Sequence, residues 1–157
     1  MPWPSPADLE SLVTRFHART LPKSEWTHAA HLAVGTWQVN AEGPERALST
    51  LRTAIRLLND AHGTANSDSG GYHETITRVY VVLIAEFLRR AEAPGRDLAA
   101  HVQALLASPV ASREALLAFY SKRRLFSVEA RRDWVEPDRA PLSLDAWLDV
   151  TVADRAG

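Results

Sequence analysis

The apolar segment of residues 72–91 constrains the fold more than any other part of the chain, and it follows a glycine-containing loop at residues 63–71. Apolar side chains recur along it every three or four residues, and Val81 and Val82 extend the apolar surface around much of a helix. A helix with so much apolar surface has to be enclosed by other helices. The pattern therefore predicts a central α-helix. A strand at residues 79–83 alone is disfavoured by the helical period on both sides.

Proline and glycine positions divide the rest of the chain into further helical segments. Within most of them, apolar residues show the spacing of one helix face. The predicted helices cover residues 7–20, 25–40, 44–61, 96–107 and 112–120, a short turn after Ser127, and residues 143–152. Ser24 is expected to cap the second of these helices and Ser143 the last.

Two segments lack a helical period. Residues 1–6 contain three prolines and are expected to form an extended arm. Residues 121–142 mix basic and aromatic side chains with two prolines and are expected to be an irregular basic segment. Residues 1–157 are therefore predicted to form one all-α domain, a bundle of about five to seven helices.

Length, amino-acid composition and net charge limit the classes of partner that the chain is expected to bind. A chain of 157 residues with 46% apolar side chains can bury its own core, and the absence of cysteine excludes disulfides and thiolate metal sites. A net charge of -1, with acids interleaved among the bases, argues against nucleic-acid and membrane-surface partners. Neither a signal peptide nor a membrane span is recognised, so a cytoplasmic location is expected.

The histidines are the most informative polar residues. If helices joined by short connections run in alternate directions, five of the six histidines lie at one end of the bundle. These five are His17, His28, His31, His62 and His73.

Three of these histidines could bind a metal ion. His28 and His31 are three residues apart and share a helix face, and His73 lies on the apolar stripe of its own helix. Neutral imidazoles suit a divalent ion such as zinc, iron or nickel. Glu74 could then be a further ligand or the base that acts on a metal-bound water, with Tyr80 beside it.

Simpler roles are open for the same residues. His17 and His62 stand near predicted helix ends, where a histidine interacts with the helix dipole. Glu74 stands three residues after Gly71, the place of a capping-box glutamate. The remaining histidines can be buried groups that hydrogen-bond to neighbouring threonines or Tyr80.

A second hypothesis needs no metal. The helix start behind Gly70, Gly71 and Tyr72 offers backbone N–H groups to an anion, and Arg131 from the basic segment could close over it. The chain would then hold a small anionic metabolite. A third hypothesis is a helical interaction module that uses Trp37, Trp147 or the basic segment as its contact surface.

The chain resembles a family of small bacterial proteins of unknown function. The resemblance lies in the motifs WTHxAHL, within residues 21–32, and GYHETIT, at residues 71–77, and in residues 120–121 and 127–131. The resemblance covers most of the chain and implies a shared site without specifying its chemistry. The histidine-bearing bundle is also similar in outline to the DinB/YfiT-like metalloenzymes. Those carry a His-x-x-x-His pair on a late helix, whereas this chain carries His-x-x-His on an early one.

The leading hypothesis is therefore a small-molecule enzyme or binder with a histidine-lined pocket at one end of the bundle, with or without a metal ion. A small-molecule ligand is the expected partner, and assembly into a homo-oligomer is compatible with the sequence.

Overall fold

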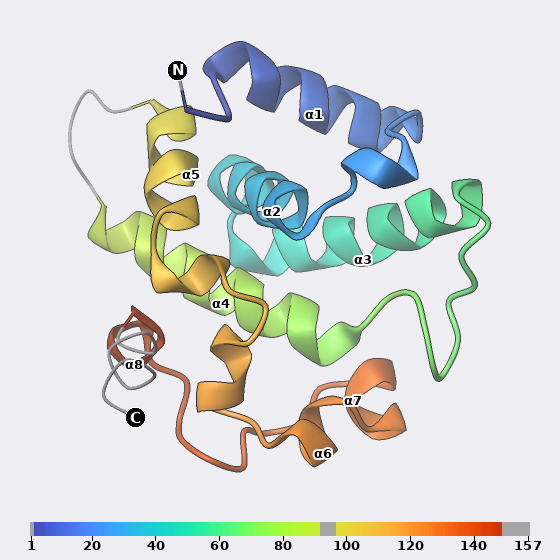
Figure 1. Cartoon of the computed structure of the whole chain (residues 1–157), viewed down its shortest axis with the longest axis vertical. Coiled ribbons are helices and arrows are strands. Elements are labelled where there is room, and N and C mark those ends of the chain that lie inside the picture. The colour runs from blue at the N-terminus through green and yellow to red at the C-terminus, as the bar shows by residue number, and fades with distance from the viewer. Residues whose placement is uncertain (1, 92–96, 149–157) are drawn as a thin grey trace.

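Helix α2 (His28–Glu42) occupies the centre of the fold, with α1 (Pro6–Ala18), α3 (Pro44–Ala61), α4 (Glu74–Arg90) and α5 (Leu98–Leu106) packed around it (Figure 1). The computed structural model describes residues 2–91 and 97–148. Within these ranges the chain has no strand, which confirms the all-α prediction.

Six short elements complete the described chain. Three are 3-10 turns, η1 (Lys23–Glu25), η2 (Pro109–Ala111) and η3 (Ala115–Ala118), and three are short α-helices, α6 (Lys122–Leu125), α7 (Val128–Arg132) and α8 (Leu144–Leu148). Helices α6 and α7 therefore interrupt the segment that was expected to be irregular. The predicted helix at residues 143–152 is seen as α8, and its last residues lie outside the described ranges.

The choice of α4 as the central helix was wrong. Eight of the 15 residues of α2 are buried, against six of 17 in α4. Small apolar side chains cover most of the circumference of α2, so helices can approach it from several sides. At Gly35 an added Cβ would lie 3.3 Å from the Ile84 side chain, so the glycine permits the close contact between α2 and α4.

The helices do not alternate up and down as predicted. In Figure 1, α2 is seen nearly along its axis, whereas α1, α3 and α4 lie across the view. A short connection keeps two helix ends near each other but leaves their crossing angle free, and side-chain packing sets that angle.

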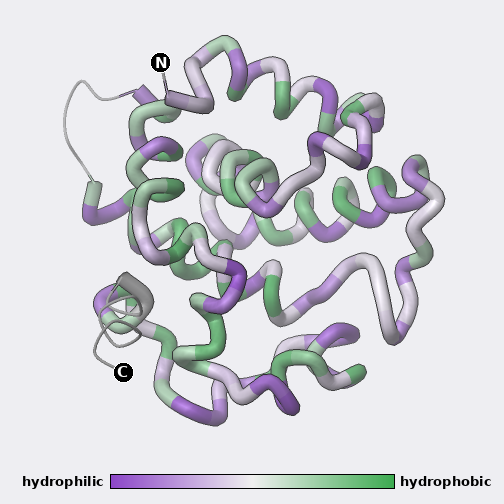
Figure 2. Tube along the Cα trace, viewed as in Figure 1, coloured by the Kyte–Doolittle hydropathy of each residue, from purple (hydrophilic) through white to green (hydrophobic). Residues whose placement is uncertain are grey.

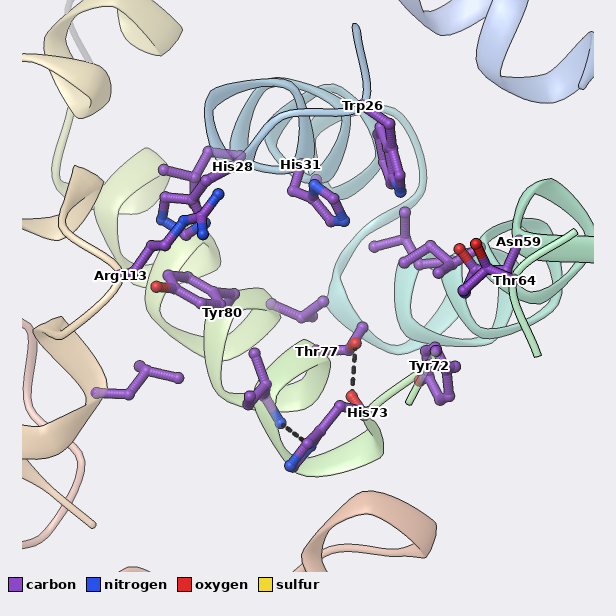
Figure 3. Close-up of a pocket in the computed structure, with 18 of the residues that line it drawn as sticks. Trp26, His28, His31, Asn59, Thr64, Tyr72, His73, Thr77, Tyr80 and Arg113 are labelled. Atoms are coloured by element: carbon purple, nitrogen blue, oxygen red, sulfur yellow. Dashed lines mark hydrogen bonds between the residues drawn. The ribbon is translucent and has the colours of Figure 1, made fainter. Parts of the chain in front are cut away.

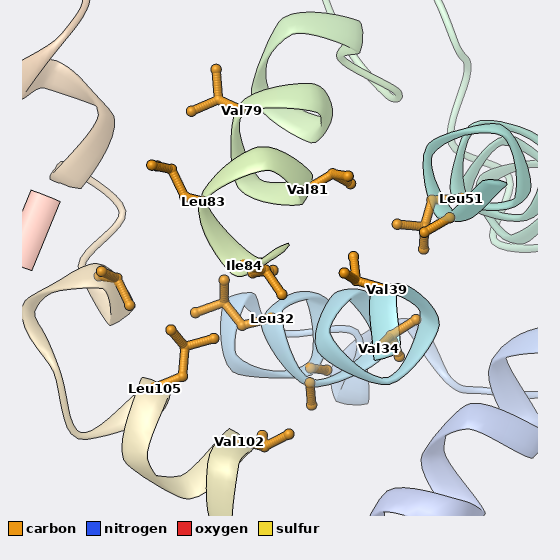
Figure 4. Close-up of a cluster of buried hydrophobic side chains, with 14 of the residues drawn as sticks. Leu32, Val34, Val39, Leu51, Val79, Val81, Leu83, Ile84, Val102 and Leu105 are labelled. Carbon is orange, nitrogen blue, oxygen red and sulfur yellow. The ribbon is translucent and has the colours of Figure 1, made fainter. Parts of the chain in front are cut away.

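The core lies where α2, α4 and α5 meet, with a contribution from α3 (Figure 4). Leu32, Val34 and Val39 come from α2 and meet Leu83 and Ile84 of α4 there. Hydrophilic and hydrophobic residues alternate along α1 and α3 in Figure 2, as expected for helices with one face in solvent. No helix in the described ranges is long and apolar enough to cross a membrane.

Two helix starts differ from their predicted positions. Helix α2 begins at His28 because Thr27 is its N-cap, with the hydroxyl accepting from the Ala30 N–H at 3.1 Å, so the prediction of Ser24 as the cap was wrong. Helix α4 begins at Glu74 because the imidazole of His73 is its N-cap. Both shifts place histidines in the first turn or directly before it.

The predicted α-helix at residues 112–120 was also wrong, because the described segment contains only the 3-10 turn η3. Backbone carbonyls of this segment bond to the chain that follows it. The Leu117 carbonyl accepts from the Arg139 guanidinium at 2.7 Å, and the Phe119 carbonyl accepts from the Arg139 N–H at 2.9 Å. These long-range bonds hold the segment in a tight turn.

The N-terminal arm is tied to α5. The side-chain amide of Gln103 donates to the Pro4 carbonyl at 2.7 Å and to the Pro2 carbonyl at 3.2 Å. Helix α1 then begins at Pro6, with a capping box between Ser5 and Asp8.

Candidate functional site

A pocket of about 660 Å³ opens between the first turns of α2, the middle of α3, the first half of α4 and the segment from Arg113 to Phe126 (Figure 3). Its walls are largely apolar, with Leu32, Leu51, Ile55, Ile76 and Ile84 among them. A mostly apolar cavity with a few converging polar groups is the usual form of a small-molecule site.

The structure brings most of the predicted site residues together in this pocket. The lining includes His28, His31, His73, Tyr80, Tyr72, Gly71 and His62. His17 is not among the lining residues, and its imidazole instead lies 2.9 Å from the Gln38 side chain. His62 bonds through Nε2 to the Leu21 carbonyl at 2.7 Å.

His31 is held as a neutral hydrogen-bond acceptor. Its Nδ1 lies 2.7 Å from the Thr27 carbonyl, and a carbonyl can only accept, so Nδ1 carries the proton. The ring stacks on Trp26, with the ring centroids 3.7 Å apart. Enclosure by the pocket walls, aided by the charges of His28 and Arg113, lowers the pKa of His31 to about 4, although the bond to Thr27 opposes this. The side chain is exposed by its overall accessible surface, and it lies on the wall of the open pocket.

His28 lies beside Tyr80 and Arg113. The His28 and Tyr80 rings meet edge to face with centroids 5.8 Å apart, and the Nε2 atom of His28 is buried without a hydrogen-bond partner. Burial, followed by the nearby Arg113 charge, lowers the pKa of His28, and burial raises the pKa of the Tyr80 hydroxyl. Both side chains are therefore uncharged at neutral pH.

His73 has a structural role at the start of α4. Its Nδ1 accepts from the Ile76 N–H at 3.1 Å, and its Nε2 donates to the Leu125 carbonyl at 2.7 Å. Both ring nitrogens are therefore engaged, and only a neutral imidazole can make this pair of bonds. Burial lowers the pKa of His73 accordingly.

Glu74 points away from the pocket. Its two carboxylate oxygens accept from the Arg52 guanidinium at 2.8 and 2.7 Å, and one of them also accepts from the Tyr72 hydroxyl at 2.8 Å. Burial raises the pKa of Glu74, but these bonds outweigh it and lower the pKa overall. The carboxylate joins α3 to the start of α4. It is the first residue of α4, so it is not the capping-box glutamate that the sequence suggested.

The glycine loop and Arg131 support each other. The Arg131 guanidinium donates to the Gly71 carbonyl at 3.0 Å and the Tyr72 carbonyl at 3.3 Å. The Tyr72 N–H in turn donates to the Asn66 side chain at 3.0 Å. Arg131 therefore braces the loop from outside, and Gly70 is not part of the pocket lining.

The arrangement gives little support to a three-histidine metal centre. Within residues 2–91 and 97–148, no three His, Asp or Glu side chains form a group that could hold a metal ion. His73 uses both ring nitrogens elsewhere, and the Arg113 cation stands near the other two histidines. A metal ion bound to all three histidines would have to displace the His73 cap of α4 and overcome repulsion from the positive charge of Arg113. The metal centre therefore stays a prediction.

Arg113 and Lys23 are the pocket residues that sequence reasoning missed. They are the two cationic side chains in the described lining, where no aspartate or glutamate occurs. Lys23 precedes the predicted second helix and Arg113 lies within the wrongly predicted helix at residues 112–120. No local motif marks either residue, because Arg113 reaches the histidines only through the folding of the segment between α5 and α6.

Comparison with protein-family models, with curated proteins and with solved structures finds no match to this chain. The resemblances described from its motifs therefore stay predictions.

Proposed function

We propose that this chain binds a small organic acid with an apolar body in the pocket between α2, α3 and α4. The observation that carries the proposal is the charge of the described lining, which includes Lys23 and Arg113 but no carboxylate. This proposal develops the anionic-metabolite hypothesis, with the anion placed at Arg113 instead of the start of α4.

Arg113 is the proposed anchor for the carboxylate. Its guanidinium makes no hydrogen bond or ion pair with any residue of the described ranges, and its charge acts on both His28 and His31. A guanidinium without a protein partner can form two parallel hydrogen bonds to a carboxylate, and such charge-assisted bonds are among the strongest available to a protein.

The volume and the apolar walls of the pocket indicate the size and character of the rest of the ligand. A volume of about 660 Å³ fits a metabolite of moderate size, and the leucine, isoleucine and valine side chains suit a hydrocarbon or aromatic body. Trp26, which stacks on His31, adds an aromatic surface at the same wall.

A metal-dependent enzyme is the second candidate, favoured only by the ring nitrogens of His28 and His31 that have no partner within the described ranges. These nitrogens could supply two of the four ligands of a tetrahedrally coordinated metal ion. Atoms of a bound small molecule or of water would then supply the other two. Metal analysis of untagged protein, beside the variant H28A/H31A, separates this candidate from the first. Near-stoichiometric zinc, iron or nickel that is lost in the variant would support it.

The first candidate is tested by titration calorimetry with hydrocinnamate and octanoate, each beside its neutral amide. We expect the acids to bind and the amides to bind at least tenfold more weakly. Arg113→Met should lower affinity for the acids by about 10- to 100-fold, since hydrogen bonds to charged groups are worth about 1.5–3 kcal/mol.

The matched control is Arg123→Met, which removes an exposed arginine outside the pocket lining and should leave acid binding unchanged. Equal affinity of wild type and Arg113→Met for both acids would remove the basis of the proposal.

A further inference from the structure

We infer that the ligand carries a hydroxyl group beside its carboxylate, so that the pocket selects α-hydroxy acids over the corresponding unsubstituted acids. The inference rests on the proposed function and adds the class of ligand. It depends on the hydrogen-bonding state of His31, which the fold sets through the backbone of α2.

The free nitrogen of His31 can only accept. Because Nδ1 donates to the Thr27 carbonyl over 2.7 Å, the neutral ring presents a lone pair at Nε2. The depressed pKa, about 4, keeps the ring neutral at physiological pH. Within the described ranges Nδ1 makes the one hydrogen bond of this imidazole, so Nε2 has no partner there, and the stack on Trp26 limits rotation of the ring.

A carboxylate cannot satisfy this nitrogen while the ring is neutral. Ionised carboxylates are acceptors only, so an acid oxygen placed at Nε2 would set two lone pairs against each other. The group that meets His31 has to be a donor, while the carboxylate takes the guanidinium of Arg113. A ligand that lacks the donor would desolvate Nε2 without replacing its bond to water, which costs affinity.

The donor and the carboxylate have to be close together in the ligand. Arg113, His28 and His31 line the same pocket, and the Arg113 charge acts on both imidazoles. Figure 3 shows His28 and His31 on α2, with Arg113 reaching His28 from the neighbouring segment at the left of the view. A hydroxyl on the carbon next to the carboxylate is the simplest arrangement that serves both groups.

The test compares matched acids by titration calorimetry at neutral pH. Phenyllactate is set against hydrocinnamate, and α-hydroxyoctanoate against octanoate, so that each pair differs by one hydroxyl. We expect each hydroxy acid to bind about tenfold more tightly than its partner, which corresponds to about 1.4 kcal/mol.

His31→Phe keeps an aromatic ring against Trp26 and removes the acceptor. This variant should abolish the preference, so that each hydroxy acid binds with the same affinity as its unsubstituted partner. The control is His101→Phe, which changes a histidine outside the pocket lining and should retain the preference. Nitrogen-15 NMR of the wild-type imidazole gives a second readout, because only the hydroxy acids should shift the His31 Nε2 signal strongly.

The outcomes separate the two proposals. Equal affinity within both pairs, or a preference that survives His31→Phe, would overturn the hydroxy-acid inference and leave the acid-binding function in place. Failure of all four acids to bind would overturn both.

Discussion

His28 carries a stability cost that has no compensation within the described chain. Its Nε2 atom is buried and makes no hydrogen bond, and a buried polar atom without a partner typically costs about 1–3 kcal/mol. His101 on α5 has the same defect at Nδ1 but lies outside the pocket lining. The two histidines therefore form a natural pair for separating stability from binding.

We expect His28→Phe to raise the free energy of unfolding by about 1 kcal/mol, since an apolar ring of similar shape no longer leaves a polar atom unpaired. For a chain of this size the melting temperature should rise by about 2–4 °C. The same variant should bind hydrocinnamate more weakly, because it loses a polar group beside Arg113.

His101→Phe should give a similar gain in thermal stability with unchanged affinity for hydrocinnamate. Calorimetric unfolding and ligand titration on both variants check this. A loss of stability in His28→Phe would mean that Nε2 has a partner, such as an ordered water, in solution.

At the scale of elements, the start of α4 and the loop before it are held by several independent contacts. Arg52 and Tyr72 bind Glu74, and Arg131 binds the loop carbonyls. In addition, Gly71 has a φ of 79°, a conformation that side chains other than glycine rarely adopt. An added Cβ would lie 2.6 Å from the Ala65 carbonyl oxygen, so no alanine fits there without movement of the backbone.

Gly71→Ala is therefore expected to destabilise the protein by roughly 1–3 kcal/mol, the usual cost of a strained backbone position. Gly70→Ala is the matched control, because its Cβ would lie 3.9 Å from the nearest atom. Urea unfolding of the two variants measures the difference. Similar midpoints for both would show that the loop relaxes freely and that its conformation does not hold α4 in place.

At the scale of the whole molecule, three neutral histidines make stability depend on pH. The pKa values of His28, His31 and His73 are all lowered in the folded chain, chiefly by burial, and that of His31 falls to about 4 from an ordinary 6.5. Below about pH 6.5 the unfolded chain binds protons that the folded chain does not. The free energy of unfolding should then fall as the pH is lowered from about 6.5 toward about 4.

Urea unfolding at several pH values across this window measures the effect. His73→Asn is a useful comparison, because asparagine can also cap α4 but does not titrate. This variant should show a shallower dependence on pH than the wild type. A wild-type midpoint that is constant or rises between about pH 6.5 and about pH 4 would contradict the assignment of neutral histidines.

Much of the fold follows from local pattern. Apolar spacing and proline or glycine breaks predicted the five long helices, because periodicity and helix-breaking residues act over a few neighbours. The helix starts at His28 and Glu74 were misplaced, because competing caps such as Ser24 and Thr27 look alike in sequence. The turn near Ala115 was missed, because Arg139 binds carbonyls of this segment from 20 and 22 residues away.

For the site, the sequence by itself determined that histidines would stand at the starts of two helices, since capping and helix-breaking residues act locally. Only the tertiary structure decided what those histidines do. Both ring nitrogens of His73 are used to hold α4, while His31 faces a cavity with Arg113 nearby. That cavity forms where α2, α3, α4 and the segment containing Arg113 meet. Crossing angles depend on how whole helix faces pack together, which no short stretch of sequence specifies.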